Sequence, residues 1–279
     1  MGTWTTQKME RYLAEGRGSG ERESYKPWIR TGDYKSQGRS TRIRSWTAHR
    51  THHLLSDNET RYFYLLDWEP SVTDLREHYP LLDLLDVLGE PDDISLQKYQ
   101  DKDTGTPLVL TLTFLITTQS PNGDERMVAR SIKSSYELEK PSVVERFELM
   151  RRYFAAKGIE WGLVTEKEIP LAKAKNIEWV HAAKEIDNEA GLANGHFEEL
   201  LQLLVDQLGS NSASVRRITT DFDTQMHLEK GTGLLFFKHL VATRRLKVNM
   251  EEPIDVGRPG SDMIRGVVPV GGDGSCAQY

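Results

Sequence analysis

The sequence predicts an α/β protein with two domains: an N-terminal domain built on a mixed β-sheet, and a mainly α-helical C-terminal domain. Between residues 56 and 165 the hydrophobic pattern follows the order helix, hairpin, helix, strand. After Pro170 the pattern is almost entirely helical. We therefore place the domains at residues 1–169 and 170–250. Residues 251–279 are rich in Pro and Gly, and we expect them to form a flexible tail.

The first helix of the sheet domain is predicted to begin at Ser56. Ser56 and Glu59 have the spacing of a capping box, in which a hydroxyl residue starts the helix and a glutamate follows three residues later. Upstream, residues 16–53 contain many glycines and polar side chains, which indicates an irregular segment. Downstream, residues 71–80 are predicted to be extended and residues 81–88 form a short apolar segment.

The clearest strand pattern lies at residues 107–118, where side chains alternate with period two. One predicted face carries Leu108, Leu110, Leu112, Phe114 and Ile116. A Pro-Asn-Gly-Asp turn at residues 121–124 then leads to a return strand at about 126–134, which predicts a β-hairpin.

The hairpin is followed by a predicted helix and a further strand. Pro141 suits the first turn of this helix, which we expect to run to about Ala156 and to end at Gly158. Residues 159–165 have the composition of an apolar strand.

The C-terminal domain is predicted to contain helices at about 171–185, 196–208, 214–229 and 234–243, followed by a short basic strand at 244–248. Helices followed by a basic strand suit a winged-helix-like domain, which binds DNA or a protein partner. A plain helical bundle is equally compatible with the pattern.

The composition excludes several classes of protein. The 279 residues contain no apolar run near 18 residues and begin with a polar segment, so we expect neither a membrane-spanning helix nor a signal peptide. A single cysteine, Cys276, excludes an internal disulfide and a cysteine-rich zinc site. A reducing cytoplasm is therefore the expected location.

Positive charge is concentrated near the N-terminus although the net charge is −6. Residues 1–53 carry eleven Lys/Arg and five Asp/Glu, against 25 and 37 in the rest of the chain. Such a basic arm can bind phosphate locally, and a merely solvated basic surface fits the charge as well. The candidate DNA contacts are Arg17, Lys26, Arg39, Arg42, Arg44, His52 and His53. For the histidines we favour phosphate or structural roles over zinc, because no Cys or carboxylate stands beside them at zinc spacing.

Three positions indicate a nuclease-type site: Glu59 on a helix, Thr113 on the first hairpin strand and Lys133 on the second. In restriction-type nucleases, carboxylates at the first two positions hold Mg²⁺ or Mn²⁺, and the lysine lies near the attacking water. Here the central acidic position is a threonine. Ordinary roles also exist, because Glu59 can serve the capping box alone and Lys133 can be an edge-strand lysine.

Short motifs over about residues 10–180 resemble the TnsA family of endonuclease subunits of Tn7-like transposons. The motifs are Gly16-Arg17-Gly18-Ser19-Gly20, Tyr25-Lys26-Pro27-Trp28, Gly38-Arg39-Ser40, His52-His53-Leu54-Leu55-Ser56-Asp57 with Glu59, Asp74-Leu75-Arg76-Glu77, Thr113-Phe114-Leu115-Ile116, Lys133, Arg151-Arg152-Tyr153 and Asn176-Ile177-Glu178-Trp179.

The resemblance implies a restriction-endonuclease-like N-terminal domain and a winged-helix-like C-terminal domain. It implies a Mg²⁺-dependent DNA endonuclease that cuts the 5′ ends of a transposon, associated with the bacterial nucleoid. The expected partners are double-stranded DNA at the transposon ends, a TnsB-type DDE transposase that cuts the 3′ ends, and a TnsC-type AAA+ ATPase. By the same resemblance, Glu59 matches the helix carboxylate that binds metal and Lys133 matches the catalytic lysine. Ser131 stands where the family usually has a metal-contacting Gln or acid, so the resemblance makes it a weak metal contact. Thr113 stands where the family has the central metal-ligand Asp.

Thr113 is the departure that bears on activity, because a neutral hydroxyl is a weak ligand and its presence should lower metal affinity. We therefore expect cleavage to be impaired or lost, unless Glu145 or Glu148 completes a rearranged site. One alternative function is a non-catalytic assembly factor that bridges transposase, regulator and DNA ends. Another is a metal nuclease that acts on DNA alone.

Overall fold

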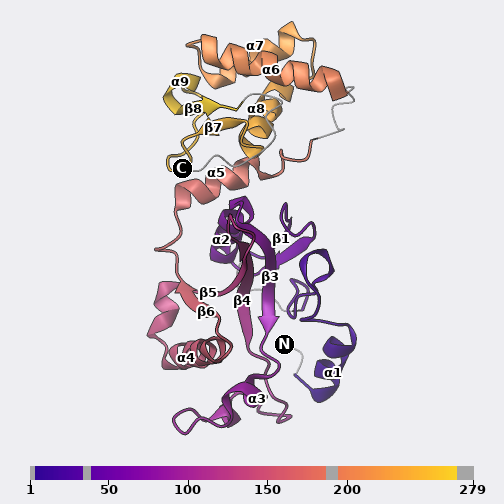
Figure 1. Ribbon diagram of the computed structural model, residues 1–279, viewed down its shortest axis with the longest axis vertical. Coiled ribbons are helices and arrows are strands. Elements are labelled where there is room, and N and C mark those ends of the chain that lie inside the picture. The colour runs from indigo at the N-terminus through magenta and orange to yellow at the C-terminus, as the bar shows by residue number, and fades with distance from the viewer. Residues whose placement is uncertain (1–3, 34–38, 187–193, 269–279) are drawn as a thin grey trace. The chain divides into compact units, whose positions relative to one another are not determined.

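The structure, a computed structural model, describes residues 4–33, 39–186 and 194–268 (Figure 1). The chain folds into two compact units, Met1–Ile169 and Pro170–Tyr279. Within the described residues, no helix is both long enough and apolar enough to cross a membrane.

A four-stranded mixed sheet forms the centre of the first unit, as predicted. Its strands lie in the order β3-β4-β5-β6, with the bounds Val72–Pro80, Thr111–Gln119, Glu125–Ile132 and Glu160–Val164 (Figure 1). The pairs β3–β4 and β4–β5 are antiparallel, and β5–β6 is parallel. A parallel pair requires a crossover connection, which helix α4 (Pro141–Ala156) supplies.

The helices of this unit begin and end close to the predicted positions. α2 spans Asp57–Trp68, and its cap is formed by the Ser56 hydroxyl, which accepts a hydrogen bond from the Glu59 amide at 3.2 Å. α4 begins with Pro141, where a missing amide hydrogen costs nothing, and it ends before Gly158, whose φ of 67° favours glycine. The short helix α3 (Leu84–Leu88) packs against the same core as α4.

Phe114 and Leu115 show which helix covers which face of the sheet. Successive side chains of a strand point to opposite faces. Leu115 lies in the apolar cluster that contains Leu149 and Phe154 of α4. The ring of Phe114 lies 6.2 Å from that of Tyr62 on α2. α2 and α4 therefore cover opposite faces of β4.

The strict alternation predicted for residues 107–118 is interrupted in β4. Leu112 packs in the same cluster as Leu115, although the pattern placed it on one face with Phe114. The register brings His78 of β3 beside this interruption, between the partners of Leu112 and Phe114. His78 has a φ of 48°, in the left-handed region that non-glycine residues rarely adopt. We attribute the change of face to this local distortion of the paired strands.

The prediction that residues 16–53 are irregular is wrong in part. This part of the chain follows helix α1 (Thr6–Ala14) and contains the 3₁₀ turn η1 (Arg22–Ser24) and the antiparallel strands β1 (Thr41–Arg44) and β2 (Thr51–Leu54). Aromatic packing holds the segment in place: Tyr12 and Trp28 are almost fully buried, and their ring centroids lie 5.4 Å apart.

The second unit contains the predicted helices and a small antiparallel sheet. Its elements are α5 (Leu171–His181), α6 (Asn194–Ser210), α7 (Val215–Gln225), α8 (Thr232–Ala242), β7 (Leu246–Val248), α9 (Gly260–Met263) and β8 (Ile264–Val267). A winged-helix arrangement of these elements remains a prediction.

The flexible-tail prediction does not hold for residues 251–268. β8 pairs with β7, and the amide of Val215 donates a hydrogen bond to the carbonyl of Arg258 at 3.0 Å. These backbone bonds tie the segment to the second unit in spite of its Pro and Gly content. The remainder of the predicted tail, residues 269–279, lies outside the described residues.

Candidate active site

The predicted nuclease positions gather at one end of the first unit's sheet. There the C-terminal ends of β3, β5 and β6 lie beside the start of β4. Asn58 in the first turn of α2 donates a hydrogen bond to the hydroxyl of Ser134, just beyond β5, at 3.4 Å. The Thr113 hydroxyl accepts a hydrogen bond from the Ile132 amide at 3.0 Å. These contacts bring the start of α2, the start of β4 and the end of β5 together.

Glu59 combines the two roles that the sequence left open. It lies in the first turn of α2, where its Oε2 accepts a hydrogen bond from the amide of Leu55 at 2.8 Å, not from the expected Ser56 amide. Its side chain is only 13% exposed, and Oε2 lies 3.9 Å from Nε2 of His78. His78 Nε2 in turn hydrogen bonds to the carbonyl of His53 at 2.8 Å. Glu59 is therefore a helix cap and also a nearly buried carboxylate at this end of the sheet.

Thr113 closes the β4–β5 ladder with its side chain. The register of β4 and β5 runs from Gln119 back to Phe114, whose partner is Arg130. Thr113 is therefore the first residue of β4 beyond the paired part of this ladder. Its hydroxyl then accepts the hydrogen bond from Ile132 that a continued ladder would give to a carbonyl. The oxygen of Thr113 is thus used for local structure.

Lys133 follows directly after β5 and is half-exposed. Its amide donates a hydrogen bond to the carbonyl of Val164, at the end of β6, at 3.0 Å. Its ammonium forms an ion pair with Oε1 of Glu137 at 3.0 Å. The backbone of Lys133 is fixed, and its charge is paired with a carboxylate of the same chain.

Ser131 does not join the other predicted positions. It is 2% exposed, and its hydroxyl accepts a hydrogen bond from Nε1 of Trp161 at 3.1 Å and lies 3.5 Å from the sulfur of Met150. Met150 belongs to α4, whereas Glu59 belongs to α2 on the opposite face. The structure thus gives no support to Ser131 as a metal contact beside Glu59.

A buried ion pair that the sequence analysis did not predict lies beside the site. Arg50 donates hydrogen bonds to both carboxylate oxygens of Glu77, at 2.9 and 2.5 Å, and the amide of His53 donates a third at 3.1 Å. Burial raises the pKa of Glu77, but His52 and Arg50 outweigh it and hold that pKa well below its ordinary value. Glu77 carries its charge in the core, in the strand that also positions His78. No signal in the sequence singles out Glu77, because the same strand also contains Asp74, Arg76 and His78.

Four of the predicted DNA contacts are exposed. Arg42 and Arg44 point outward on β1, on either side of the buried Ile43. Lys26 and Arg39 are also exposed. These cations are accessible to a phosphate backbone.

The other three predicted DNA contacts are occupied within the protein. Arg17 is 6% exposed, and its guanidinium pairs with Asp33 at 2.5 Å and with Glu15 at 2.7 Å. His52 is fully buried beside Glu77. His53 is partly buried and its Nδ1 hydrogen bonds with Thr31; burial lowers the pKa of His53. The register of β1 and β2 accounts for His52, which is the partner of the inward Ile43.

The predicted positions offer few ligands to a metal ion. Among residues 4–33, 39–186 and 194–268, no three His, Cys, Asp or Glu side chains gather closely enough to hold a metal ion. The carboxylates suggested as replacements lie on α4 and have other partners: Glu145 accepts hydrogen bonds from Lys98 and Tyr99, and Glu148 accepts them from Arg151 and Arg152. Glu59 is thus the one acid at the predicted positions.

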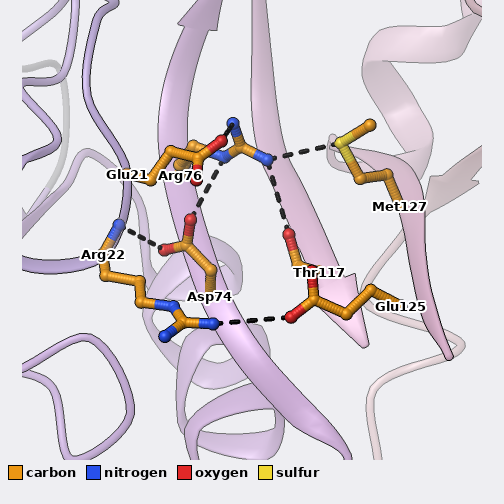
Figure 2. A pocket seen from close by; sticks show the side chains of 7 residues that line it. All are labelled: Glu21, Arg22, Asp74, Arg76, Thr117, Glu125 and Met127. Carbon is orange, nitrogen blue, oxygen red and sulfur yellow. Dashed lines mark hydrogen bonds and ion pairs between the residues drawn. The ribbon is translucent and has the colours of Figure 1, made fainter. Parts of the chain in front are cut away.

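A polar pocket of about 320 Å³ lies elsewhere in the first unit, beside β3, β4 and β5 (Figure 2). In Figure 2 the buried Arg76 lies between Asp74, at 3.3 Å, and Glu21, at 3.5 Å. An exposed pair between Arg22 and Glu125, at 3.4 Å, spans its rim. None of the predicted nuclease positions lines this pocket.

Comparison with known proteins identifies the family. Residues 69–166 match the TnsA-like endonuclease N-terminal domain, and residues 168–250 match the TnsA endonuclease C-terminal domain. The chain is 32% identical over 243 residues to the transposon Tn7 transposition protein TnsA of Escherichia coli. The aligned residues make up 87% of this chain and 86% of that protein. This protein therefore belongs to the TnsA endonuclease family.

Proposed function

We propose that this chain is the TnsA-type subunit of a DNA transposition machine and that its own strand-cleaving centre is impaired. Its relative in Escherichia coli is a transposition protein, and the similarity extends over both units of the chain. In this proposal the subunit binds double-stranded DNA at transposon ends. It acts with a TnsB-type transposase and a TnsC-type AAA+ ATPase, and cleavage of the 5′ strands is the part of its role that the impaired centre reduces.

The hydrogen bond between the Thr113 hydroxyl and the Ile132 amide carries the proposal of impairment. At this position the chain has a neutral side chain whose oxygen already accepts a backbone hydrogen bond. The other two positions are also engaged, Glu59 with the Leu55 amide and Lys133 with Glu137. Glu59 is the one carboxylate among the three predicted positions, and the nearby Glu137 is paired with Lys133. With so little available negative charge, the site is poorly suited to hold a divalent cation that would stabilise a phosphoryl transition state.

Binding to DNA is supported separately from cleavage. Arg42 and Arg44 form an exposed basic strand edge, and each contact between an arginine and a phosphate releases counterions from the DNA. Both residues precede the strand β2 that leads directly into α2 and Glu59. A basic strand adjoining the site is suited to hold the backbone of a bound duplex.

The test is a reconstituted excision reaction with a matching transposase and ATPase, with both strands at each end scored separately. The proposal predicts that this chain enters the DNA complex but adds little or no 5′-strand cleavage to the 3′ cleavage of the transposase. The same reaction with Glu59→Ala should look unchanged. Efficient 5′ cleavage that disappears in Glu59→Ala would show that the site is active and the impairment absent.

The second candidate is a non-catalytic assembly factor. The hydrogen bond that the Thr113 hydroxyl accepts from the Ile132 amide favours this candidate as well. In that case the yield of 3′-cleaved or joined product should depend on the presence of this chain and not on the residue at position 59. A product yield that is the same with and without the chain would contradict this second candidate.

A further inference from the structure

Lys133 is paired with a carboxylate of its own chain. Its Nζ lies 3.0 Å from Oε1 of Glu137, and the two side chains are 37% and 23% exposed. The pair is accessible to solvent, so an incoming anion can reach the ammonium. Glu137 belongs to the 3₁₀ turn η3 (Ser135–Glu139), which begins two residues after Lys133.

The backbone on both sides of this pair is anchored. The Lys133 amide bonds to the Val164 carbonyl at 3.0 Å. The amide of Ser135 donates to Glu166 at 2.9 Å, and the hydroxyl of Ser135 donates to the same carboxylate. The amide of Lys140 donates to the carbonyl of Glu137 at 3.2 Å. A fixed strand end and a fixed turn therefore place Glu137 beside Lys133.

The carboxylate of Glu137 and a DNA phosphate offer Lys133 the same chemistry. Each presents anionic oxygens to an ammonium that has three donors and acts as a point charge. An exposed ion pair is weak, whereas a duplex carries a dense array of phosphates and gains free energy from counterion release. A phosphate of a duplex bound at this end of the sheet can replace Glu137 as the partner of the Lys133 ammonium.

We propose that Glu137 is a positioning residue that holds Lys133 in an internal ion pair, which a DNA phosphate displaces when the duplex binds. The inference rests on the proposed function in one respect, the binding of DNA at this end of the sheet. Glu137 then sets how readily Lys133 engages the backbone of the substrate.

The experiment measures affinity for a transposon-end duplex with the full chain and the variants Glu137→Gln, Glu139→Gln and Lys133→Gln. Glu139 is exposed on the same turn, so its substitution removes the same charge nearby without touching the pair. Glu137→Gln should tighten binding about two- to fivefold, because the phosphate no longer has to displace an exposed ion pair, which contributes little. The slope of the salt dependence should stay the same, because Lys133 contacts one phosphate in both proteins. Glu139→Gln should change affinity by less than about twofold.

The double variant Lys133→Gln/Glu137→Gln separates the pair from general electrostatics. If the gain comes through Lys133, Glu137→Gln has no further effect once Lys133 is neutral. Equal gains from Glu137→Gln and Glu139→Gln would overturn the proposal, and so would a gain that persists in the double variant.

A second measurement works without DNA. Acetylation of Lys133 by a small reagent, followed by mass spectrometry, should be several-fold faster in Glu137→Gln and unchanged in Glu139→Gln. Unchanged acetylation in both variants would show that Glu137 does not hold the lysine. Faster acetylation with no duplex binding by any variant would leave the ion pair standing, and would contradict phosphate displacement and the proposed DNA-binding function.

Discussion

Replacing Glu77 by glutamine should destabilise the first unit severely. Glu77 is fully buried and accepts two hydrogen bonds from Arg50, which is itself 8% exposed. Glu77→Gln leaves the guanidinium in the core without a counter-charge, and breaking a buried pair in this way costs about 3–5 kcal/mol. Because this is a large fraction of the stability of a domain, the variant should unfold at much lower urea concentration than the wild type.

Tryptophan fluorescence is the appropriate assay, because five of the six tryptophans precede Pro170 and therefore report on the first unit. The matched control is Glu125→Gln, which removes the same charge from the exposed pair with Arg22. Exposed pairs contribute about 0–1 kcal/mol, so the control should unfold almost like the wild type. A loss below about 1 kcal/mol in Glu77→Gln would refute the reasoning from burial.

The same pair predicts a pH dependence. The pKa of Glu77 is held well below its ordinary value in the folded state, so the stability that it contributes is fully present above the unfolded-state pKa. This contribution is lost as the pH falls through the lowered folded-state pKa. Wild-type stability should therefore decline below about pH 4.5, and the decline should be shallower in Glu77→Gln, as urea titrations at several pH values would show. Equal slopes in the two proteins would contradict the assignment of the charge to Glu77.

The remaining predictions concern single contacts. Thr113→Ala leaves the Ile132 amide without its acceptor and should cost about 1 kcal/mol in urea unfolding, whereas no measurable loss would show that the bond is unimportant. Arg42→Ala and Arg44→Ala should each weaken duplex binding and lower the salt slope by about 1 without changing stability. Arg17→Ala should instead lower stability and leave the salt slope unchanged, because its guanidinium is buried among acids; an altered slope would mean that it contacts DNA.

Local signals in the sequence were sufficient for the elements that frame the site. The capping pattern of Ser56 and Glu59 predicted the start of α2, and the Pro-Asn-Gly-Asp turn predicted the β4–β5 hairpin. Both signals act within a few residues, so no knowledge of the fold is required to recognise them.

Other features depend on contacts between distant residues. The alternation of β4 is interrupted beside the left-handed His78 of β3, and a period-two pattern read from one strand cannot reveal the conformation of its neighbour. The burial of Ser131 and of His52 also depends on residues that are distant in the sequence. Ser131 lies against Met150 of α4, and His52 is the partner of the inward Ile43 of β1. The charge of Glu77 is retained in the core because His52 and Arg50, 25 and 27 residues earlier, lie beside it.

The segment after residue 250 shows the limit of composition as a guide. Its Pro and Gly content resembles that of flexible chains, yet the β7–β8 pairing and the bond between Val215 and Arg258 tie it to the second unit. Pairing across a fold depends on where the partner strand lies, and composition carries no record of that position.

The most direct test of the impaired site compares 5′-strand cleavage of a transposon-end duplex by the wild type, Thr113→Asp and the double variant Thr113→Asp/Glu59→Ala. All three are assayed with Mg²⁺ and with transposase and ATPase present. If the missing carboxylate is the defect, Thr113→Asp should cleave at least tenfold faster than the wild type, and the double variant should lose that gain. A wild type that cleaves as fast as Thr113→Asp would contradict the account, because the hydroxyl at position 113 would then be no impairment.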